Sequence, residues 1–248
     1  MPVSGGSRVT ALPSGLELSG GKIDKLELKG TSGINPVVST GLETICTQGG
    51  IRNVLASAEQ LKIKSSSAND TNSGSAHARR VRLRGLDTNG LEIQEDVNLN
   101  GTAAVTTTAS FLAVNDVRVH KVGSGSTVNE GVISVNNNAD DTTLYEIAAG
   151  ENQQQSASFT IPSNKTGYLT SFVCSATGNA YVSIWVQKLT APFQQRLTLI
   201  VGAGGPTPYQ LPNPFQIDPG ATVEFRAKRI GSSDVAVAAD FQLILESE

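Results

Sequence analysis

The chain is poor in the residues that most often build catalytic and metal sites. Its 248 residues include two histidines (His77 and His120), two cysteines and one tryptophan, and aromatic residues make up 5%. The sequence contains no HExxH pair, no CxxC pair and no GxSxG elbow, the motifs of zinc peptidases, zinc ribbons and α/β-hydrolases. In "GLELSGGK", Ile23 stands where a phosphate loop needs Ser or Thr to hold magnesium. We therefore expect no enzyme, no catalytic residue, no metal site and no cofactor.

Charge and long apolar runs are also scarce, and this argues against nucleic-acid and membrane partners. Charged residues make up 17% of the chain, below the roughly 25% of typical soluble domains. A net charge of -3 supplies no basic field for phosphate backbones. No apolar run approaches the roughly 20 residues of a membrane span, and "MPVSGGSRVTALPSG" has no apolar signal-peptide core. We expect synthesis in a reducing cytoplasm, with Cys46 and Cys174 as free thiols in separate domains.

What the chain does contain is typical of β proteins. Gly, Ser, Thr and Asn are abundant, and runs of Leu, Glu, Lys and Ala with helical spacing are missing. Its length favours two hydrophobic cores over one. The sequence therefore predicts an all-β protein in three parts: an N-terminal arm with short strands (1–40), a β-sandwich or barrel domain (41–148), and a jelly-roll-like β-sandwich domain (149–248).

The arm contains a short internal repeat ten residues apart, "GLELSGG" at 15–21 and "KLELKGT" at 25–31. The alternating leucines predict a hairpin or an extended arm with two strands. Two strands alone are only marginally stable in water. We therefore expect the arm to lie on its own domain or on a neighbouring subunit.

Alternating apolar residues between turn signals predict the strands of both domains. In the first domain they are 60–66, 78–86, 91–100, 110–122, 131–137 and 143–149. In the second they are 156–161, 167–174, 180–189, 194–201, 221–229 and 234–246. The proline-rich stretch "GGPTPYQLPNPFQIDPG" (204–220) predicts a loop, because proline disrupts a central strand.

The stretch "RRVRLRGLDTNGLEIQEDVNLNG" (79–101) has two opposed interpretations, a polyanion site and a charge-balanced hairpin. Period two places Arg80, Arg82 and Arg84 on one face, and Val81 and Leu83 on the other. "DTNG" predicts a type I turn with Gly90 at positive φ. The returning strand predicts Leu91, Ile93, Val97 and Leu99 inside, Glu92 and Asp96 opposite the arginines, and Glu95 at a bulge or an interface. These patterns favour the hairpin.

Three further groups of residues are candidates for binding. "NNNADDTT" could hold calcium through Asp140 and Asp141, but a hairpin turn is the favoured interpretation. His77 precedes a strand and is predicted to be exposed rather than catalytic. Carboxylate pairs for glycoside hydrolysis remain possible, since any two acids can meet in the fold. An exposed aromatic platform would indicate a carbohydrate-binding module, and its candidates are Tyr181, Trp185 and Tyr209.

Three long stretches resemble a family of virion structural proteins of tailed bacteriophages, common in marine and cyanobacterial phages. They are "INPVVSTGLETICTQGG", "IKSSSANDTNSGSAHARRVRLRGLDTNGLEIQEDVNLNGTAAVTTTASFLAVNDVRV" and "FTIPSNKTGYLTSFVCSATGNAYVSIWVQK". The resemblance covers roughly residues 34–190, with "SSSANDT", the "GLD…E" hairpin and "LNGT…VTT" as recurring features. The first 33 residues do not share it. The motifs are structural rather than catalytic.

The resemblance and the composition together imply a non-enzymatic virion component made in the host cytoplasm. We expect a decoration or cement protein on the head surface, a homotrimer whose partners are the major capsid protein and copies of itself. The alternatives are a tail, baseplate or fibre-associated protein and a host carbohydrate-binding module that contacts a host glycan. Binding residues are not identified by the sequence.

Overall fold

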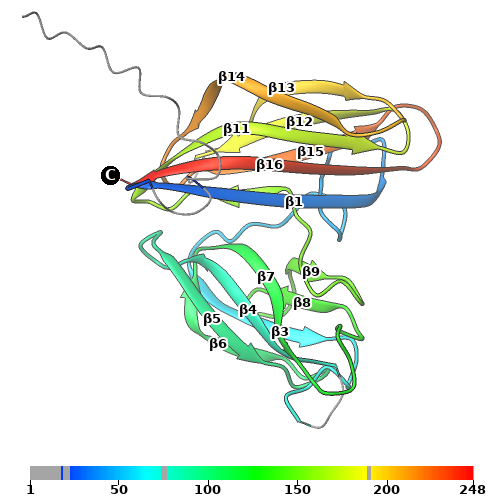
Figure 1. Ribbon diagram of the computed structural model, residues 1–248. Helices are drawn as coiled ribbons and strands as arrows, with labels where there is room; N and C mark the ends of the chain where they lie inside the picture. Colours follow the sequence, from blue (N-terminus) through cyan, green and yellow to red (C-terminus); the bar gives the residue numbers. More distant parts are fainter. Residues whose placement is uncertain (1–17, 19–22, 74–76, 189–190, 248) are drawn as a thin grey trace, which may run out of the picture.

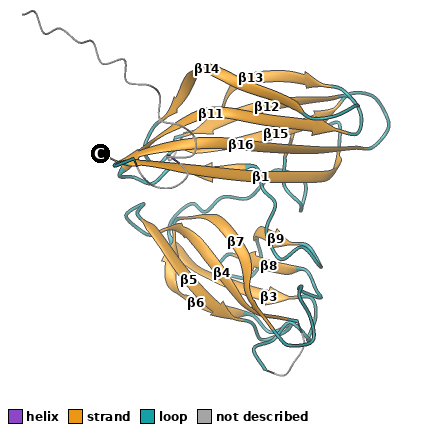
Figure 2. Cartoon of the chain, in the orientation of Figure 1, coloured by secondary structure: helices purple, strands orange, loops and turns teal. Residues whose placement is uncertain are grey.

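The computed structural model describes residues 18, 23–73, 77–188 and 191–247. Sixteen strands, paired antiparallel wherever they meet in a sheet, make up its regular structure, so the predicted all-β class is confirmed. Figure 2 shows these strands joined by loops and turns. The first segment of the predicted arm, residues 15–21, lies outside the described residues except for Leu18.

Eight main strands, β1 and β10 to β16, form a jelly roll, the upper body in Figure 1. One sheet has the order β1-β16-β11-β14 and the other β10-β15-β12-β13, with the two-residue β2 beside β15. In chain order, the first, eighth, third and sixth main strands share one sheet, and the second, seventh, fourth and fifth share the other. This is the two-sheet jelly-roll arrangement, as predicted for the C-terminal domain. Its strands are β1 (Leu26–Val38), β2 (Glu43–Thr44), β10 (Ser158–Thr160), β11 (Lys165–Ala176), β12 (Ala180–Gln187), β13 (Gln194–Val201), β14 (Thr207–Ile217), β15 (Thr222–Arg229) and β16 (Val235–Ser247).

Alternation of apolar side chains explains why these segments form strands around one core. Every second residue of β16 from Val235 to Leu245 is buried between the sheets. At the centre, the ring of Phe225 stacks on that of Phe241 at 4.9 Å and meets the edge of Phe172 at 5.5 Å. These rings come from both sheets and fix how the two layers face each other.

Seven strands form a second domain, the lower body in Figure 1. Its sheets have the orders β6-β3-β8-β9 and β5-β4-β7. Side chains from both sheets meet in a separate core that includes Leu61, Leu83, Phe111, Val117 and Ile133. The strands are β3 (Glu59–Ser65), β4 (Ala78–Leu86), β5 (Glu92–Asn98), β6 (Val105–Phe111), β7 (Ala113–Val122), β8 (Ile133–Asn136) and β9 (Thr143–Ile147).

The strand pairing corrects the predicted separation of residues 26–40 as an arm. β1 pairs with β16 from Leu26 opposite Glu246 to Val38 opposite Val235. Figure 1 shows these two ends of the chain side by side, β1 in blue and β16 in red. Gly33 lies so close to β10 that a Cβ there would stand 2.2 Å from the Ala157 nitrogen. The jelly roll is therefore built from both ends of the described chain, and the second domain is inserted between β2 and β10.

The proline-rich stretch is also a correction, because it forms β14 rather than a loop. β14 is an edge strand that pairs with β11 on one side only. Pro208 stands opposite Val173, and the register shifts between Gln210 and Phe215, where Pro212 and Pro214 lie. An edge strand tolerates proline, because one row of its N–H groups needs no ladder partner.

One predicted strand, 110–122, is two strands. β6 ends at Phe111 and β7 begins at Ala113, and between them the Leu112 N–H donates to the Leu86 carbonyl (2.8 Å). The first part of β6, "VTTTA", was not predicted because threonine and alanine there give little apolar contrast. The strand crosses from one sheet to the other at this point.

Candidate functional site

The two domains meet at the turn of the β4–β5 hairpin. The Gly90 N–H donates to the Asp87 carbonyl (3.0 Å), and Gly90 has the predicted positive φ, 74°. The tip rests on the jelly roll: the Ser163 N–H donates to the Gly90 carbonyl (2.8 Å), and the Ser163 hydroxyl donates to the Asn89 carbonyl (2.8 Å). The hairpin is therefore a contact between domains as well as a turn.

Next to this turn, an ion cluster joins β1, β5 and β11. The Lys165 ammonium lies 2.9 Å from the Glu27 carboxylate and 2.5 Å from that of Glu92, and Lys29 approaches both acids. Burial raises the pKa of the Glu27 carboxyl, but hydrogen bonds from Lys29 and Lys165 outweigh this and hold that pKa below its usual value. Burial lowers the pKa of Lys165, but its bonds to Glu92 and Glu27 outweigh this and raise it. The cluster holds the domains together while both carboxylates are ionised.

A second polar network, buried between the domains, centres on the fully buried Glu224 of β15. Arg226 Nε and the Thr44 hydroxyl each donate to Glu224 Oε1 at 2.7 Å. Arg52 Nη2 lies 3.4 Å from Glu224 Oε2, and Arg52 Nη1 donates to the Tyr145 hydroxyl (2.8 Å). Two guanidinium groups thus share one carboxylate, which leaves an excess positive charge in this network.

Sequence reasoning did not identify this network. The only local signal is the i, i+2 pair Glu224 and Arg226 in "TVEFRAKR", which predicts a shared strand face but not its burial. Arg52 comes from a loop, and Tyr145 comes from β9 of the other domain. Their meeting depends on domain packing, which the local pattern does not encode.

A cleft of about 630 Å³ lies between the β1 side of the jelly roll and the β4-β5-β7 sheet. Arg118 Nη2 lies 2.7 Å from Asp116 Oδ2, and Arg84 lies 3.7 Å from the same oxygen. Across the cleft, burial raises the pKa of the Asp240 carboxyl. The described lining residues include neither histidine nor cysteine, so none of its serines has an imidazole base beside it. The cleft offers hydrogen bonds for a polar ligand such as a sugar.

The β4 arginines lie on the face opposite Val81 and Leu83, as the favoured interpretation predicted, and Arg82 has the expected acidic partner across the hairpin. Val81 and Leu83 are fully buried on the opposite face. Arg82 donates to both carboxylate oxygens of Asp96, at 2.7 and 2.9 Å, and these bonds hold the pKa of Asp96 below its usual value. Arg80 and Arg84 donate instead to the uncharged amide oxygens of Asn98 and Gln94, and Arg84 also lies 3.7 Å from the Asp116 carboxylate.

Two details of the predicted hairpin are wrong, and of the two alternatives for Glu95 the bulge is excluded. Glu92 does not face the arginines, because its carboxylate binds Lys165 of the other domain. Leu91 is 41% exposed rather than inside, since it belongs to the turn. Glu95 pairs with Leu83 without a bulge, and its carboxylate accepts the backbone N–H groups of residues 108 and 109 in β6. This carboxylate joins the edges of the two sheets.

The histidines lie apart from each other. His120 Nε2 is 2.8 Å from Arg82 Nη2, next to the Arg82–Asp96 pair. His77 Nε2 is 3.7 Å from Glu130 and is half-buried. Within the ranges that the structure describes, no three His, Cys, Asp or Glu side chains gather in a metal-binding group. Neither imidazole is placed beside a nucleophile.

The proposed calcium ligands form the hairpin turn between β8 and β9. The Asp140 carboxylate accepts hydrogen bonds from Lys64 (2.8 Å) and from the Asn136 amide (2.6 Å). The Asp141 carboxylate accepts one from the Asn137 amide (2.8 Å). Each aspartate thus binds its own local partner, which supports the hairpin interpretation.

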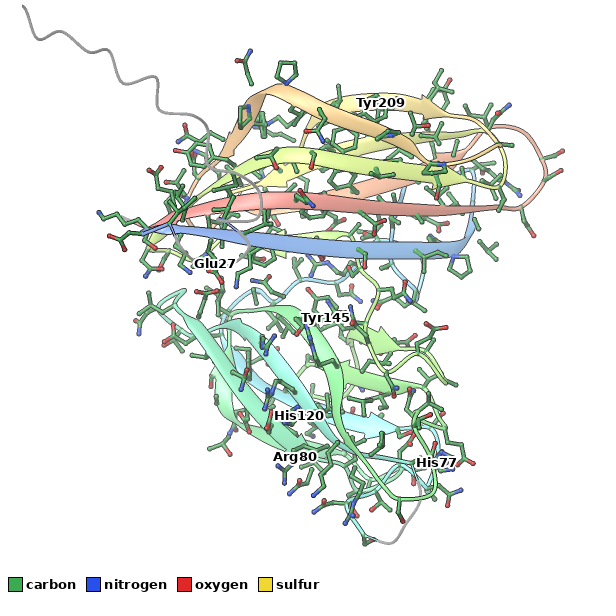
Figure 3. All side chains as sticks on the ribbon, viewed as in Figure 1. Glu27, His77, Arg80, His120, Tyr145 and Tyr209 are labelled. Atoms are coloured by element: carbon green, nitrogen blue, oxygen red, sulfur yellow. The ribbon has the colours of Figure 1, made fainter. Side chains whose placement is uncertain are left out.

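The three candidate aromatic residues do not form one platform. Tyr181 and Trp185 lie half-buried on the outer face of β12, and the Arg226 guanidinium stands 5.1 Å from the Trp185 ring centroid. Tyr209 instead belongs to β14 of the other sheet (Figure 3), and its ring stacks on that of Phe172 with the ring centroids 4.9 Å apart. A sugar ring could therefore not stack on all three at once.

The edge strands β13 and β14 are the last strands of the two jelly-roll sheets, on the side away from the inserted domain (Figures 1 and 2). Arg196 is the only charged residue in either strand. Ile200 points outward and is 66% exposed. The inward apolar side chains of these strands are only half-buried: Leu197, Leu199, Tyr209, Leu211 and Phe215. An open edge with few charges and incompletely covered apolar residues is suited to contact with another chain.

Both cysteines are free and buried, as expected, but they do not lie in separate domains. Cys174 belongs to the jelly-roll core. Cys46 follows β2, and its backbone forms an isolated antiparallel β-bridge with Ser156, just before β10. Burial raises the pKa of each thiol to about 12. Such thiols are poor nucleophiles at neutral pH.

No helix of the described ranges has the length and apolar character of a membrane span. No known family model and no curated protein sequence matches the chain. Among solved structures, the Gx strain of infectious bursal disease virus is 10% identical, with 90% of this chain and 76% of that chain covered and a TM-score of 0.22. The VP2 subviral particle of the same virus is 9% identical, with 91% and 73% covered and a TM-score of 0.22. Similarity this weak carries no inference about function.

Proposed function

We propose that this chain is a structural protein of a tailed-bacteriophage virion, bound as a trimer to the head surface as a decoration or cement protein. The observation that carries the proposal is the open β13–β14 edge of the jelly roll. A second support is the resemblance of residues 34–190 to phage virion proteins. The partners are the major capsid protein and further copies of this chain.

The open edge supplies the physical reason for assembly. Its half-buried leucines and aromatic rings gain about 25 cal/mol for each Å² of apolar surface that a partner covers. Prolines in β14 protect that strand against strand addition, so its contacts are made through side chains. Around a threefold axis, each copy would offer this edge to a different surface of the next copy, and the ring would close.

A map of whole particles by cryo-electron microscopy tests the proposal. We expect density for this chain at symmetry positions of the head, in hundreds of copies, with β13 and β14 in contact with a neighbour. A handful of copies at the tail or baseplate would contradict head placement. Density with β13 and β14 facing solvent would contradict the role of the open edge.

A variant pair tests the edge itself. Leu199→Glu with Leu211→Glu places charges on half-buried inward positions and should abolish trimers in sedimentation and attachment to stripped particles. Thr198→Glu with Gln210→Glu changes the neighbouring exposed positions of the same strands and should leave both intact. Circular dichroism confirms that each variant folds.

Host glycan binding is a second candidate function, favoured by the polar side chains that line the 630 Å³ cleft. Its guanidinium, carboxylate and amide groups could hydrogen-bond sugar hydroxyls. A glycan array tests this directly. Binding lost in Asp116→Asn and kept in the Leu199→Glu, Leu211→Glu variant would support a glycan site, and absence of binding across the array would contradict it.

A further inference from the structure

A second cleft between the domains, of about 450 Å³, has mainly apolar walls. They come from the loop before β3, from the β6–β7 crossing and from β9, with Val54, Leu55, Leu86, Leu112 and Leu144 among them. Clefts of this size between domains, apolar with a few placed polar groups, are the usual form of small-molecule sites.

Among the described residues that line this cleft, Arg52 alone carries a full charge. Its side chain is 5% exposed. A guanidinium has five N–H donors. The described chain offers this one two acceptors, the Tyr145 hydroxyl at 2.8 Å and Glu224 Oε2 at 3.4 Å, and leaves its Nε without a partner. Buried donors without acceptors are costly, so the site is incomplete on its own.

The charges around Arg52 also indicate that the site lacks a partner, in this case an anion. Glu224 is shared with Arg226, whose contact with it is shorter (2.7 Å). The Tyr145 hydroxyl donates its proton to the Val114 carbonyl (2.6 Å), so towards Arg52 it acts as an acceptor. The network therefore carries one positive charge more than its carboxylate neutralises, and it lies beside an apolar cleft.

We propose that this cleft binds a small amphiphilic carboxylate, with its single negative charge at the Arg52 guanidinium and its apolar chain along Val54, Leu86 and Leu144. A carboxylate is the matching anion, because it has one charge and planar acceptors that suit a guanidinium fork. It would neutralise the excess charge and fill the free donors, while the chain covers the apolar walls. Because Thr160 and Thr222 of the jelly roll also line the cleft, the ligand would contact both domains.

Titration calorimetry of the full chain with octanoate, octanol and octylamine tests the site. We expect octanoate to bind and to raise the melting temperature, octanol to bind at least about tenfold more weakly, and octylamine not to bind. Equal affinity for octanoate and octanol would mean an apolar cleft without anion recognition and would overturn the proposal.

Variants assign the binding to the cleft. Arg52→Met should reduce octanoate affinity at least about tenfold without changing that for octanol, and Arg80→Met, on the exposed face of β4, should change neither. Because loss of Arg52 could prevent folding, Ala56→Trp provides a second test: residue 56 is exposed at the cleft, and a bulky ring there should block octanoate while the Arg52 network remains. Undiminished octanoate binding to Ala56→Trp would overturn the proposal.

Discussion

Gly90 and Ser163 lie in backbone contact across the domain junction. The Ser163 N–H donates to the Gly90 carbonyl at 2.8 Å, and a Cβ on Gly90 would stand 2.9 Å from the Ser163 Cβ. The hairpin turn therefore needs glycine for two reasons, its positive φ and the approach of the other domain.

A comparison of Gly90→Ala with Gly150→Ala distinguishes the cost of positive φ from the cost of the close contact with Ser163. Gly150 also has positive φ, 82°, but nothing lies within 4 Å of a Cβ there. We expect Gly150→Ala to cost about 1–2 kcal/mol through backbone strain alone, and Gly90→Ala to cost about 1 kcal/mol more through the contact. Urea unfolding measures both. Equal losses would show that the hairpin tip does not press on the jelly roll.

The two faces of β4 predict opposite responses to substitution. Replacing Arg80, Arg82 and Arg84 together by Gln should barely change stability, because exposed pairs contribute little. Val81→Asp should cost roughly 3–5 kcal/mol or prevent folding, because its carboxylate would lie in the core without a partner. Thermal unfolding followed by circular dichroism checks both. A tolerated Val81→Asp with an unfolded triple variant would reverse the two faces.

The hairpin shows how much of this fold local patterns can predict. Strict alternation from Arg80 to Arg84 was enough to place the strand and its faces, and the turn signal "DTNG" placed the turn at Gly90. The alternation of apolar and polar residues does not identify which other element of the fold a strand contacts. Glu92 has the parity of a cross-strand partner for the arginines, yet it binds Lys165 because the jelly roll ends beside it.

The jelly roll shows the same limit on a larger scale. β1 and β16 both alternate, but nothing local to either one indicates that they pair across the length of the chain. β14 was missed because proline excludes a central strand and not an edge strand, and edge position is a property of the whole sheet. The clefts and the Arg52 network arise between domains, so no single segment predicts them.

Both thiols should be inert in the folded protein. Burial raises the pKa of Cys46 and of Cys174 to about 12, so neither forms thiolate near neutral pH. We expect iodoacetamide to label neither in native protein, and both after unfolding in urea. Because the folded state keeps these protons after unfolded thiols would lose them, stability should also fall as the pH rises above about 8.5. Rapid native labelling would contradict the burial of these residues.

The ion cluster at the junction should make stability depend on pH in the acid range. The pKa of Glu27 is lowered in the folded protein, so its contribution is present above the unfolded pKa and is lost as the pH falls through the folded one. We expect the melting temperature to fall less between about pH 6 and pH 3 in Lys165→Met than in the unmodified protein. Lys188→Met, which removes an exposed lysine paired with Asp218, is the control and should keep the original slope. Parallel curves for all three proteins would show that the cluster does not couple the domains.

The position of β1 predicts different effects for two N-terminal deletions, one that ends before β1 and one that removes it. Removal of residues 1–17 leaves the buried Leu18 and every pair between β1 and β16 in place, and we expect that variant to fold with nearly the original melting temperature. Removal of residues 1–38 deletes the edge strand β1, so that β16 is unpaired on one side. It also removes the buried Val38 and exposes the core that Val38 covers. We expect the longer deletion to aggregate or to be digested rapidly in limited proteolysis. Residues 150–248 alone lack β1 and β2 as well, so they should fail in the same way. If either shortened jelly roll folds and resists protease, β1 is a dispensable arm, and the chain has the linear order of domains that its sequence first indicated.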